Sequence, residues 1–437
     1  MWRPTPSQAA CLPAPSGCVS PKQSAPSMTA ISQVHRKKGF IAAMTEALKI
    51  GLLTYHFSDN YGALYQAYSL REWFRGRGTE AEFIPYHPAY VEDGGPFDRP
   101  WDLRLWRKNA TILYMKLSQR QRQLFGDQSM RAGFESFRRE HLGVTRAPLA
   151  TRDALRTQVA GFDMLVCGSD QIWNPSVQRG LDPVYFLDIP GAEHARKLAY
   201  APSFGRSDIG AAHHAELARL ARGLDGISVR EASGRAILTA AGIAPEAIEV
   251  VPDPTLLLGR LDALLGPERG TQDTVFCYAL RTDAVIRPLA EAVSRQLGAR
   301  LVSARGNRQR WRDIGTGIVP TPVEWLRMLA NARFVVSNSF HGVALSIALN
   351  RPFLAAGLPG RKAGMNARVM DLLALTGLED RLISDQNLND AAQLLARPID
   401  WAGVNSRLSA ARLRAETYLD AHLAALRAKP RSEVAAR

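Results

Sequence analysis

The sequence has little of what defines several large protein classes. Its 437 residues include four cysteines, Cys11, Cys18, Cys167 and Cys277, and no C-x-x-C pair. The spacing therefore predicts no disulfide framework. Cys167 and Cys277 lie in apolar runs and are expected to be buried thiols of a reducing compartment. Because the sequence also has no apolar run long enough to span a membrane and no secretory signal, we expect a cytoplasmic protein.

The short motifs of several cofactor-dependent enzyme classes are missing as well. The sequence contains no G-x-G-x-x-G loop, no P-loop, no H-E-x-x-H helix and no D-x-D-like constellation. These motifs place phosphates on glycine-rich turns or metal ligands on one helix face. We therefore predict no bound dinucleotide, no cofactor and no metal requirement.

Acidic residues are outnumbered, at 41 against 55 lysines and arginines, which gives a net charge of +14. Such an excess attracts nucleic acid, an anionic membrane surface or a phosphorylated substrate. Part of it lies in residues 1–46, which are rich in proline, serine and alanine without periodicity and are predicted to be a disordered extension. A second concentration lies between Arg104 and Arg146. No nucleic-acid-binding motif is present, so nucleic acid is not an expected partner.

The rest of the chain alternates strand-like and helix-like segments, at 46% hydrophobic and 22% charged residues. This alternation predicts two Rossmann-like, doubly wound α/β domains facing a cleft, at 47–255 and 256–400, followed by a C-terminal helix and tail at 401–437. The first domain contains a basic helical insertion at about 100–146. Such a stretch is usually a helical pair with a solvated basic face; the alternative is peripheral contact with an anionic membrane surface.

The segment from Arg333 to Phe353 carries the main candidate site. The apolar run 334–336 predicts a buried strand, and the polar turn Ser337-Asn338-Ser339 and the pair His341-Gly342 follow it before a helix at about 343–349. Ligands of open α/β sheets bind at the carboxyl ends of strands, beside helix N-termini. A histidine there can move protons near a bound anion. Taken alone, His341 is equally consistent with a residue that caps or packs the turn.

A second polar segment follows the predicted strand at 162–166. It reads C-G-S-D-Q-I-W-N-P over residues 167–175. Ser169, Asp170 and Gln171 supply the hydrogen-bonding groups that a sugar needs, and Trp173 offers a flat apolar face. The alternative is a turn that satisfies its own hydrogen bonds around a packed tryptophan.

Several segments, in order, resemble the polysaccharide pyruvyl transferase family. They cover roughly residues 48–400 and include T-Y-H-F-S-D-N-Y-G-A-L-Y-Q-A-Y at 54–68, F-D-M-L-V-C-G-S-D-Q-I-W-N-P at 162–175, I-S-V-R-E at 227–231, V-P-D-P-T-L-L-L at 251–258, V-V-S-N-S-F-H-G-V-A-L-S-I at 335–347 and N-A-R-V-M-D-L-L at 366–373. The resemblance implies a glycosyltransferase-B-like fold. It also implies transfer of pyruvate from phosphoenolpyruvate, the donor substrate, onto a saccharide as a ketal, in exopolysaccharide or cell-surface glycan synthesis.

The resemblance also implies roles for individual residues. His341 would be the acid–base group, and Arg230, at a strand end, would supply fixed positive charge as a bidentate fork. The characterised members carry an arginine two residues before the histidine, where this chain has Ser339. That departure shifts the role of the cation toward Arg361 or Arg368. The donor would be held by Asn338, Ser339, Gly342, Arg361, Lys362 and Arg368. By position and residue type, the acceptor would be held by Asn60, Tyr61, Gln66, Ser169, Asp170, Gln171 and Trp173.

Two other functions remain open at this point. The same fold would suit a glycosyltransferase that uses a nucleotide sugar. A non-catalytic protein that binds saccharide or nucleic acid would also suit the basic charge. For the enzyme, the expected partner is a saccharide acceptor, lipid- or nucleotide-linked, and the expected location is the cytoplasm, with possible attachment to the inner face of the membrane.

Overall fold

The structure is a computed structural model that describes residues 47–428, apart from 94–96, 98, 100, 103–105, 126, 179, 268–269, 281–283, 306–312 and 361–365. The predicted disordered extension, 1–46, lies outside the described residues. Residues Ala47–Arg437 form one compact unit that contains both predicted domains.

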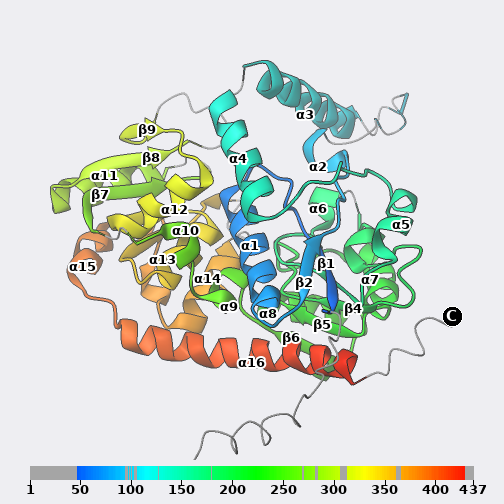
Figure 1. The fold of residues 1–437 in the computed structure, drawn as a ribbon. Coiled ribbons are helices and arrows are strands. Elements are labelled where there is room, and N and C mark those ends of the chain that lie inside the picture. Colours follow the sequence, from blue (N-terminus) through cyan, green and yellow to red (C-terminus); the bar gives the residue numbers. More distant parts are fainter. Residues whose placement is uncertain are drawn as a thin grey trace, which may run out of the picture. The chain divides into compact units, whose positions relative to one another are not determined.

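The N-terminal lobe is built on a parallel six-stranded sheet in the order β2-β1-β3-β4-β5-β6 (Figure 1). Parallel sheets carry helices on both faces, so their strands are apolar throughout rather than alternating. Strand β3, for example, is buried at all four positions. The strands are β1 (Lys49–Leu53), β2 (Glu80–Phe83), β3 (Met164–Cys167), β4 (Arg196–Ala199), β5 (Gly226–Val229) and β6 (Ile248–Val250).

The C-terminal lobe contains a second parallel sheet of six strands, in the order β12-β11-β10-β7-β8-β9. Its strands are β7 (Gln272–Tyr278), β8 (Arg300–Ala304), β9 (Thr316–Ile318), β10 (Ala332–Ser337), β11 (Phe353–Ala356) and β12 (Leu382–Ile383). The central strand β10, which precedes the main candidate site, pairs with β7 and β11. The prediction of two doubly wound α/β domains is therefore confirmed.

Helices connect the strands of both lobes. The α-helices are α1 (Tyr61–Arg75), α2 (Tyr90–Asp93), α3 (Trp106–Phe125), α4 (Gln128–His141), α5 (Arg156–Val159), α6 (Pro175–Gln178), α7 (His214–Ala221), α8 (Ala232–Ala240), α9 (Pro254–Leu258), α10 (Asp262–Leu265), α11 (Ile286–Leu297), α12 (Pro322–Asn331), α13 (Phe340–Ala348), α14 (Ala367–Thr376), α15 (Ala391–Ala396) and α16 (Trp401–Arg427). The predicted insertion at 100–146 contains α3 and α4. No helix of the described part of the chain is both long enough and apolar enough to cross a membrane.

Two local predictions need correction. The helix after β10 begins at Phe340 rather than near residue 343, because Ser339 caps it, and His341 therefore lies in its first turn. The two prolines on either side of Asp253 predict a stiff turn at the strand end, but Pro254 is the first residue of α9. Proline is favoured at that position because its missing N–H has no partner within the helix. The short strands β9, β11 and β12 were not predicted.

The last helix, α16, connects the two lobes. It packs against α14 of the C-terminal lobe and against α9. Farther along α16, the Tyr418 hydroxyl donates a hydrogen bond to the carbonyl of Ala199 on β4, at 3.0 Å. The predicted C-terminal helix therefore returns to the N-terminal sheet, and it extends the apolar core there through Leu419 and Leu423, while residues 429–437 of the predicted tail lie outside the described residues.

Candidate active site

The polar turn after β10 is fixed by its own hydroxyl groups. Ser337 Oγ donates to the carbonyl of Tyr278 at 2.8 Å and accepts from the Ser339 amide at 3.1 Å. Ser339 Oγ then caps α13 by accepting from the Gly342 amide at 3.4 Å. A capping serine satisfies an amide that a helix leaves unbonded in its first turn. Ser339 thus has a structural task in this chain, at the position where the resemblance places an arginine.

Two glycines allow the close packing around His341. A Cβ atom on Gly342 would lie 2.2 Å from Ser337 Oγ, so the first turn of α13 can approach β10 only with glycine there. A Cβ atom on Gly62, in the first turn of α1, would lie 2.2 Å from Nδ1 of His341. The imidazole therefore rests directly on the backbone of α1, and the helices of both lobes hold it in place. His341 is 6% exposed.

Asp253 connects the residues of this site. It is buried at the N-terminus of α9, where its Oδ1 accepts from the amide and the hydroxyl of Thr255 at 3.0 and 2.8 Å. Its Oδ2 accepts from Arg230 Nη1 at 3.1 Å and from Ser169 Oγ at 3.2 Å, and it lies 3.4 Å from His341 Nε2. Burial by itself would raise the pKa of this carboxyl, but His341 and Arg230 reverse that effect and hold the pKa of Asp253 well below its usual range. Asp253 is therefore a carboxylate that faces the imidazole.

The His341 ring is held in one orientation, but its Nε2 makes no hydrogen bond to the described residues. Its Nε2 lies within ion-pair distance of Asp253, yet this nitrogen has no hydrogen bond of good geometry to any described residue. A buried nitrogen without a partner carries a free-energy cost unless a ligand or water satisfies it. The His341–Asp253 pair can therefore serve as an acid–base dyad, in which the carboxylate sets the orientation of the ring.

Arg230 follows β5 and is buried between two carboxylates. Its Nε donates to Glu231 at 2.8 Å, and its guanidinium lies 4.1 Å from the centre of the Phe340 ring. Burial opposes the charge of Arg230, but Glu231 and Asp253 outweigh that effect and raise its pKa. Arg230 Nη2 is buried and makes no hydrogen bond to the described residues. The site therefore has a permanently charged hydrogen-bond donor that is available to an anion.

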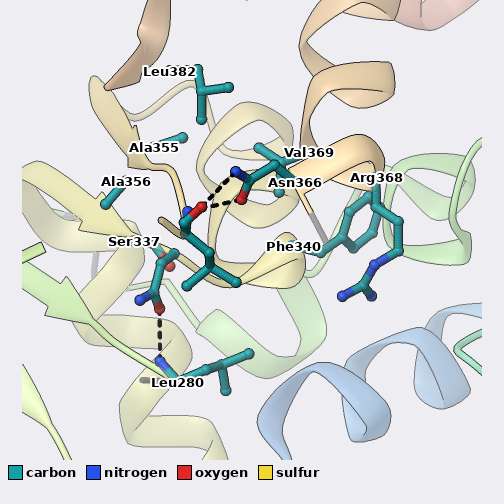
Figure 2. A pocket seen from close by; sticks show the side chains of 11 residues that line it. Leu280, Ser337, Phe340, Ala355, Ala356, Asn366, Arg368, Val369 and Leu382 are labelled. Carbon is teal, nitrogen blue, oxygen red and sulfur yellow. Dashed lines mark hydrogen bonds between the residues drawn. The ribbon is translucent and has the colours of Figure 1, made fainter. Parts of the chain in front are cut away.

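A second arginine lies beside the first. Arg368 is in the first turn of α14, and its pKa is lowered by burial and by the nearby charge of Arg230. Its Nε is also buried without a hydrogen-bond partner in the part of the chain that the structure describes. Figure 2 shows the Arg368 side chain next to Phe340, at one end of a pocket that Asn366 also lines. Two neighbouring cations with unused donors are typical of an anion-binding site.

The pocket itself lies at the carboxyl edge of the second sheet, where the fold places ligands. Ser337 and Ala356 line it from the ends of β10 and β11. The Asn338 side chain accepts from the Leu280 amide at 2.9 Å, and Asn366 holds the backbone of Leu358 with hydrogen bonds of 2.9 and 3.0 Å (Figure 2). Of the predicted donor-binding residues, Arg361 and Lys362 lie outside the described residues. Asn338, Ser339 and Gly342 shape the turn, and Arg368 faces the pocket.

Three predicted acceptor residues come from the start of α1. Asn60 caps the helix by accepting from the Ala63 amide at 3.3 Å. Tyr61 is 1% exposed, stacks on Trp325 of the C-terminal lobe and donates to the carbonyl of Pro320 at 2.7 Å. Gln66 is fully buried, and its side-chain oxygen accepts from the Ser169 amide at 3.0 Å. The structure therefore places Tyr61 and Gln66 in internal contacts, with their polar atoms bonded within the protein.

The other acceptor candidates follow β3, and one needs correction. Trp173 is 0% exposed, stacks on Phe186 at 4.6 Å and donates from Nε1 to the carbonyl of Tyr185 at 2.8 Å. Neither face of its ring is available to a sugar, so the expectation of a stacking platform is wrong. Ser169 is buried and bonds Asp253. Asp170 and Gln171 are half-buried, and they bond the Gln171 amide and Asn174, respectively.

Three important residues escaped the sequence analysis. Asp253 was given no role from the sequence, although an acid between two prolines at a strand end is a usable signal. Glu231 directly follows Arg230 and balances its charge, and Phe340 directly precedes His341 and faces the Arg230 guanidinium. Their roles arise because the ends of β5 and β6 in one lobe lie near the end of β10 in the other. The spacing of residues along the sequence does not reveal this proximity.

Comparisons with known proteins identify the family of the chain. The family model described as polysaccharide pyruvyl transferase matches residues 60–357, about two thirds of the chain and all of the segments around Arg230, Asp253 and His341. No curated protein sequence matches the chain.

Several solved structures resemble the chain at low identity. MnaA of S. aureus with UDP has a TM-score of 0.48 at 13% identity and covers 88% of this chain and 99% of its own. UDP-N-acetylglucosamine 2-epimerase from Rickettsia bellii has a TM-score of 0.45 at 11% identity, with 88% and 99% coverage. HepE of Anabaena with UDP-glucose has a TM-score of 0.41 at 10% identity, with 85% and 95% coverage. At these values the structures are not evidence for the substrate of this chain. The match of the family model to more than half of the sequence shows that the chain belongs to the polysaccharide pyruvyl transferase family and is a transferase.

Proposed function

We propose that the protein transfers pyruvate from phosphoenolpyruvate to two hydroxyl groups of a saccharide, forming a ketal in the synthesis of an exopolysaccharide or another cell-surface glycan. One observation carries the proposal. An imidazole held against a buried carboxylate lies at the same strand ends as two arginines that keep buried, unbonded nitrogen atoms among the described residues. The reaction needs both an acid–base group and a receptor for a small, highly charged anion.

The chemistry assigns a task to each group. Protonation of the enol carbon of phosphoenolpyruvate makes its neighbouring carbon electrophilic, and a sugar hydroxyl attacks there. Phosphate leaves as the carbon–oxygen bond to it breaks, and the second hydroxyl closes the ketal. The two hydroxyl groups lose two protons in total. One proton is added to the carbon, and the released inorganic phosphate takes up the other. His341, oriented by Asp253, would deliver or accept the proton.

The arginines would hold the donor. Phosphoenolpyruvate carries a carboxylate and a phosphate, and both bind well to the planar fork of a guanidinium. Arg230 is already held by Glu231 and Asp253 and would contribute Nη2, while Arg368 has Nε to offer. Because Ser339 is occupied as a helix cap, Arg368 is the residue that would take over the role of a cation near His341.

Incubation with labelled phosphoenolpyruvate and a panel of saccharide acceptors tests the proposal. We expect release of inorganic phosphate in proportion to label transferred, and a product that gains one acidic group. His341→Ala should lower the rate by roughly 10²–10⁴-fold, the range for loss of a general acid–base group. The exposed His194 provides the matched control, since His194→Ala should leave the rate unchanged. Label transfer that survives His341→Ala, or transfer from a nucleotide sugar without phosphate release, would contradict the proposal.

A further inference from the structure

Helix α3 exposes an apolar stripe that the lobe does not bury. Trp106, Leu113 and Leu117 are 59%, 49% and 55% exposed, and Ala110 is also exposed. Spacings of four, three and four residues place these side chains on one face of a helix. Two further aromatic residues, Trp101 just before the helix and Tyr114 within it, are 81% and 72% exposed.

The stripe is separate from the face by which α3 packs on the protein. Ile112 is only 2% exposed and Met115 is half-buried, so these residues form the inner face. The inner face rests near α2, and Figure 1 shows α3 beside α2 and one end of α4. Folding of α3 therefore does not require the outer apolar stripe. A contiguous exposed apolar surface of this kind marks an interaction site more often than chance.

The charge of α3 indicates what the stripe meets. The helix contains Arg107, Lys108, Lys116, Arg120 and Arg122 and no acidic residue. The other long helix, α16, also exposes a large apolar residue, Leu413, but it mixes acidic and basic residues, and Glu416 and Asp420 pair with Arg77. An aromatic and aliphatic stripe on a helix whose own charged residues are all basic is the pattern of a helix that lies on an anionic lipid surface.

A second copy of the chain fits this surface poorly. Pairing two α3 helices along their stripes would bring together cations from both, with no acidic residue on either helix to pair with them. Helix pairs that associate through such a stripe rely on opposite charges along its flanks. We propose that α3 docks the protein on an anionic membrane surface, with the stripe in the headgroup region and Lys116 and Arg120, which lie beside the stripe along the helix, against lipid phosphates.

Docking would also specify the acceptor, and this part rests on the proposed function. A transferase held at a lipid surface meets saccharides that are linked to lipid far more often than free ones, because confinement raises their effective concentration. The acceptor class inferred is therefore a lipid-linked saccharide. Docking itself does not depend on the activity and can be tested without any substrate.

Vesicle cosedimentation of the full chain is the test. Vesicles of equimolar phosphatidylcholine and phosphatidylglycerol should bind the protein, and vesicles of phosphatidylcholine alone should bind it weakly. The triple variant Trp106→Ser, Leu113→Ser, Leu117→Ser should lose about tenfold or more in partitioning. The double variant Lys116→Glu, Arg120→Glu should lose a similar factor and reduce the effect of salt. Leu413→Ser with Arg414→Glu, the same changes on an exposed part of α16, is the matched control and should bind as the wild type does.

The two α3 variants distinguish a loss of docking from misfolding, because only the triple variant changes apolar contacts. Circular dichroism checks that both variants remain folded. Equal binding of wild type and both variants, or no binding to the anionic vesicles, would overturn the proposal. A concentration-dependent dimer in light scattering that the triple variant abolishes would assign the stripe to a second copy instead. Tighter binding to a DNA duplex than to vesicles at the same salt concentration would assign it to nucleic acid.

The same variants separate this proposal from the proposed function. If both hold, the α3 variants transfer pyruvate to a water-soluble acceptor at the wild-type rate but lose about tenfold or more on an acceptor embedded in vesicles. If the protein binds vesicles but transfers no pyruvate to either acceptor, docking stands and the proposed function fails. If the protein transfers pyruvate but does not bind vesicles, the proposed function stands and docking fails.

Discussion

The two polar segments that follow buried strands differ in how they use their hydrogen-bonding groups. After β3, Ser169 and Trp173 bond within the N-terminal lobe, Ser169 in part to Gln66 of α1, and Trp173 also loses both ring faces to packing. At the ends of β5 and β10 and in the first turn of α14, Arg230, His341 and Arg368 each have a buried nitrogen that makes no hydrogen bond to the described residues. Residue types alone made both segments look like binding sites.

The difference shows that unused bonding capacity, more than polarity, identifies a site in this protein. Buried polar groups are almost always paired in folded proteins. Three such nitrogens without hydrogen bonds, all on cationic or titratable groups at adjoining strand and helix ends, therefore make this segment the stronger candidate for binding an anion. The first segment still matters, because Ser169 donates to the same carboxylate that faces His341.

The largest effect on stability is expected from removing the central carboxylate. Asp253→Leu would leave the buried Arg230 with a single carboxylate partner and His341 with none, and it would uncap α9. Breaking a buried ion pair in this way costs about 3–5 kcal/mol in the free energy of unfolding. Urea unfolding measures the loss. Asp385→Leu, at an exposed position, is the control and should change stability by less than about 0.5 kcal/mol. Equal stability of both variants would show that the cluster is not a buried charge network.

A second histidine, in the scaffold, provides the pH-dependent contrast with His341. His56 follows β1, is 3% exposed and lies 3.1 Å from the Thr54 carbonyl through Nδ1. Burial lowers the pKa of His56 to about 4. As the pH falls, His56 is therefore protonated near pH 6.5 in the unfolded chain but only near pH 4 in the folded protein. Stability from this residue is complete above about pH 6.5 and declines as the pH falls toward 4, by about 3 kcal/mol.

His56→Phe isolates that contribution. Its free energy of unfolding should vary less than that of the wild type between pH 7 and 4, by about the same 3 kcal/mol. Denaturant titrations at several pH values measure the difference. Parallel pH profiles for the two proteins would mean that folding does not lower the pKa of His56.

The contact between Gly62 and His341 can be tested by overfilling it. Gly62→Ala places a methyl group where the imidazole lies, so the ring must shift. A displacement of about 1 Å at a reacting group can cost about 10²-fold in rate. We expect kcat to fall and the free energy of unfolding to decrease by about 1–3 kcal/mol, the usual cost of overpacking. Gly76→Ala, at the other end of α1, is the control because its nearest neighbour lies at 3.3 Å.

The smallest effect is expected from the tryptophan of the scaffold segment. Trp173→Phe removes the hydrogen bond to Tyr185 and some packing, at about 1–2 kcal/mol of stability. KM for the acceptor should not change, because the ring touches no ligand. An increase in KM at unchanged stability would restore the interpretation of Trp173 as a sugar platform.

Most of the fold was predictable, because buried parallel strands and amphipathic helices leave strong periodic signals. The short strands β9, β11 and β12 were not predicted, since two to four residues carry no period. His341, Arg230 and Arg368 were identified through position and family resemblance. Asp253 was missed as a partner because it acts across the interface between lobes, and Trp173 was misassigned because its sequence context does not reveal its burial.

Calorimetric titration of phosphoenolpyruvate into the wild type, Arg368→Gln and Trp173→Phe tests the central claim most directly. Loss of a charged hydrogen bond costs about 1.5–3 kcal/mol, so Kd should rise by roughly 10- to 150-fold in Arg368→Gln. Trp173→Phe should bind as the wild type does. Equal affinity of wild type and Arg368→Gln, or weaker binding by Trp173→Phe alone, would contradict the assignment of the donor site to the unpaired arginines.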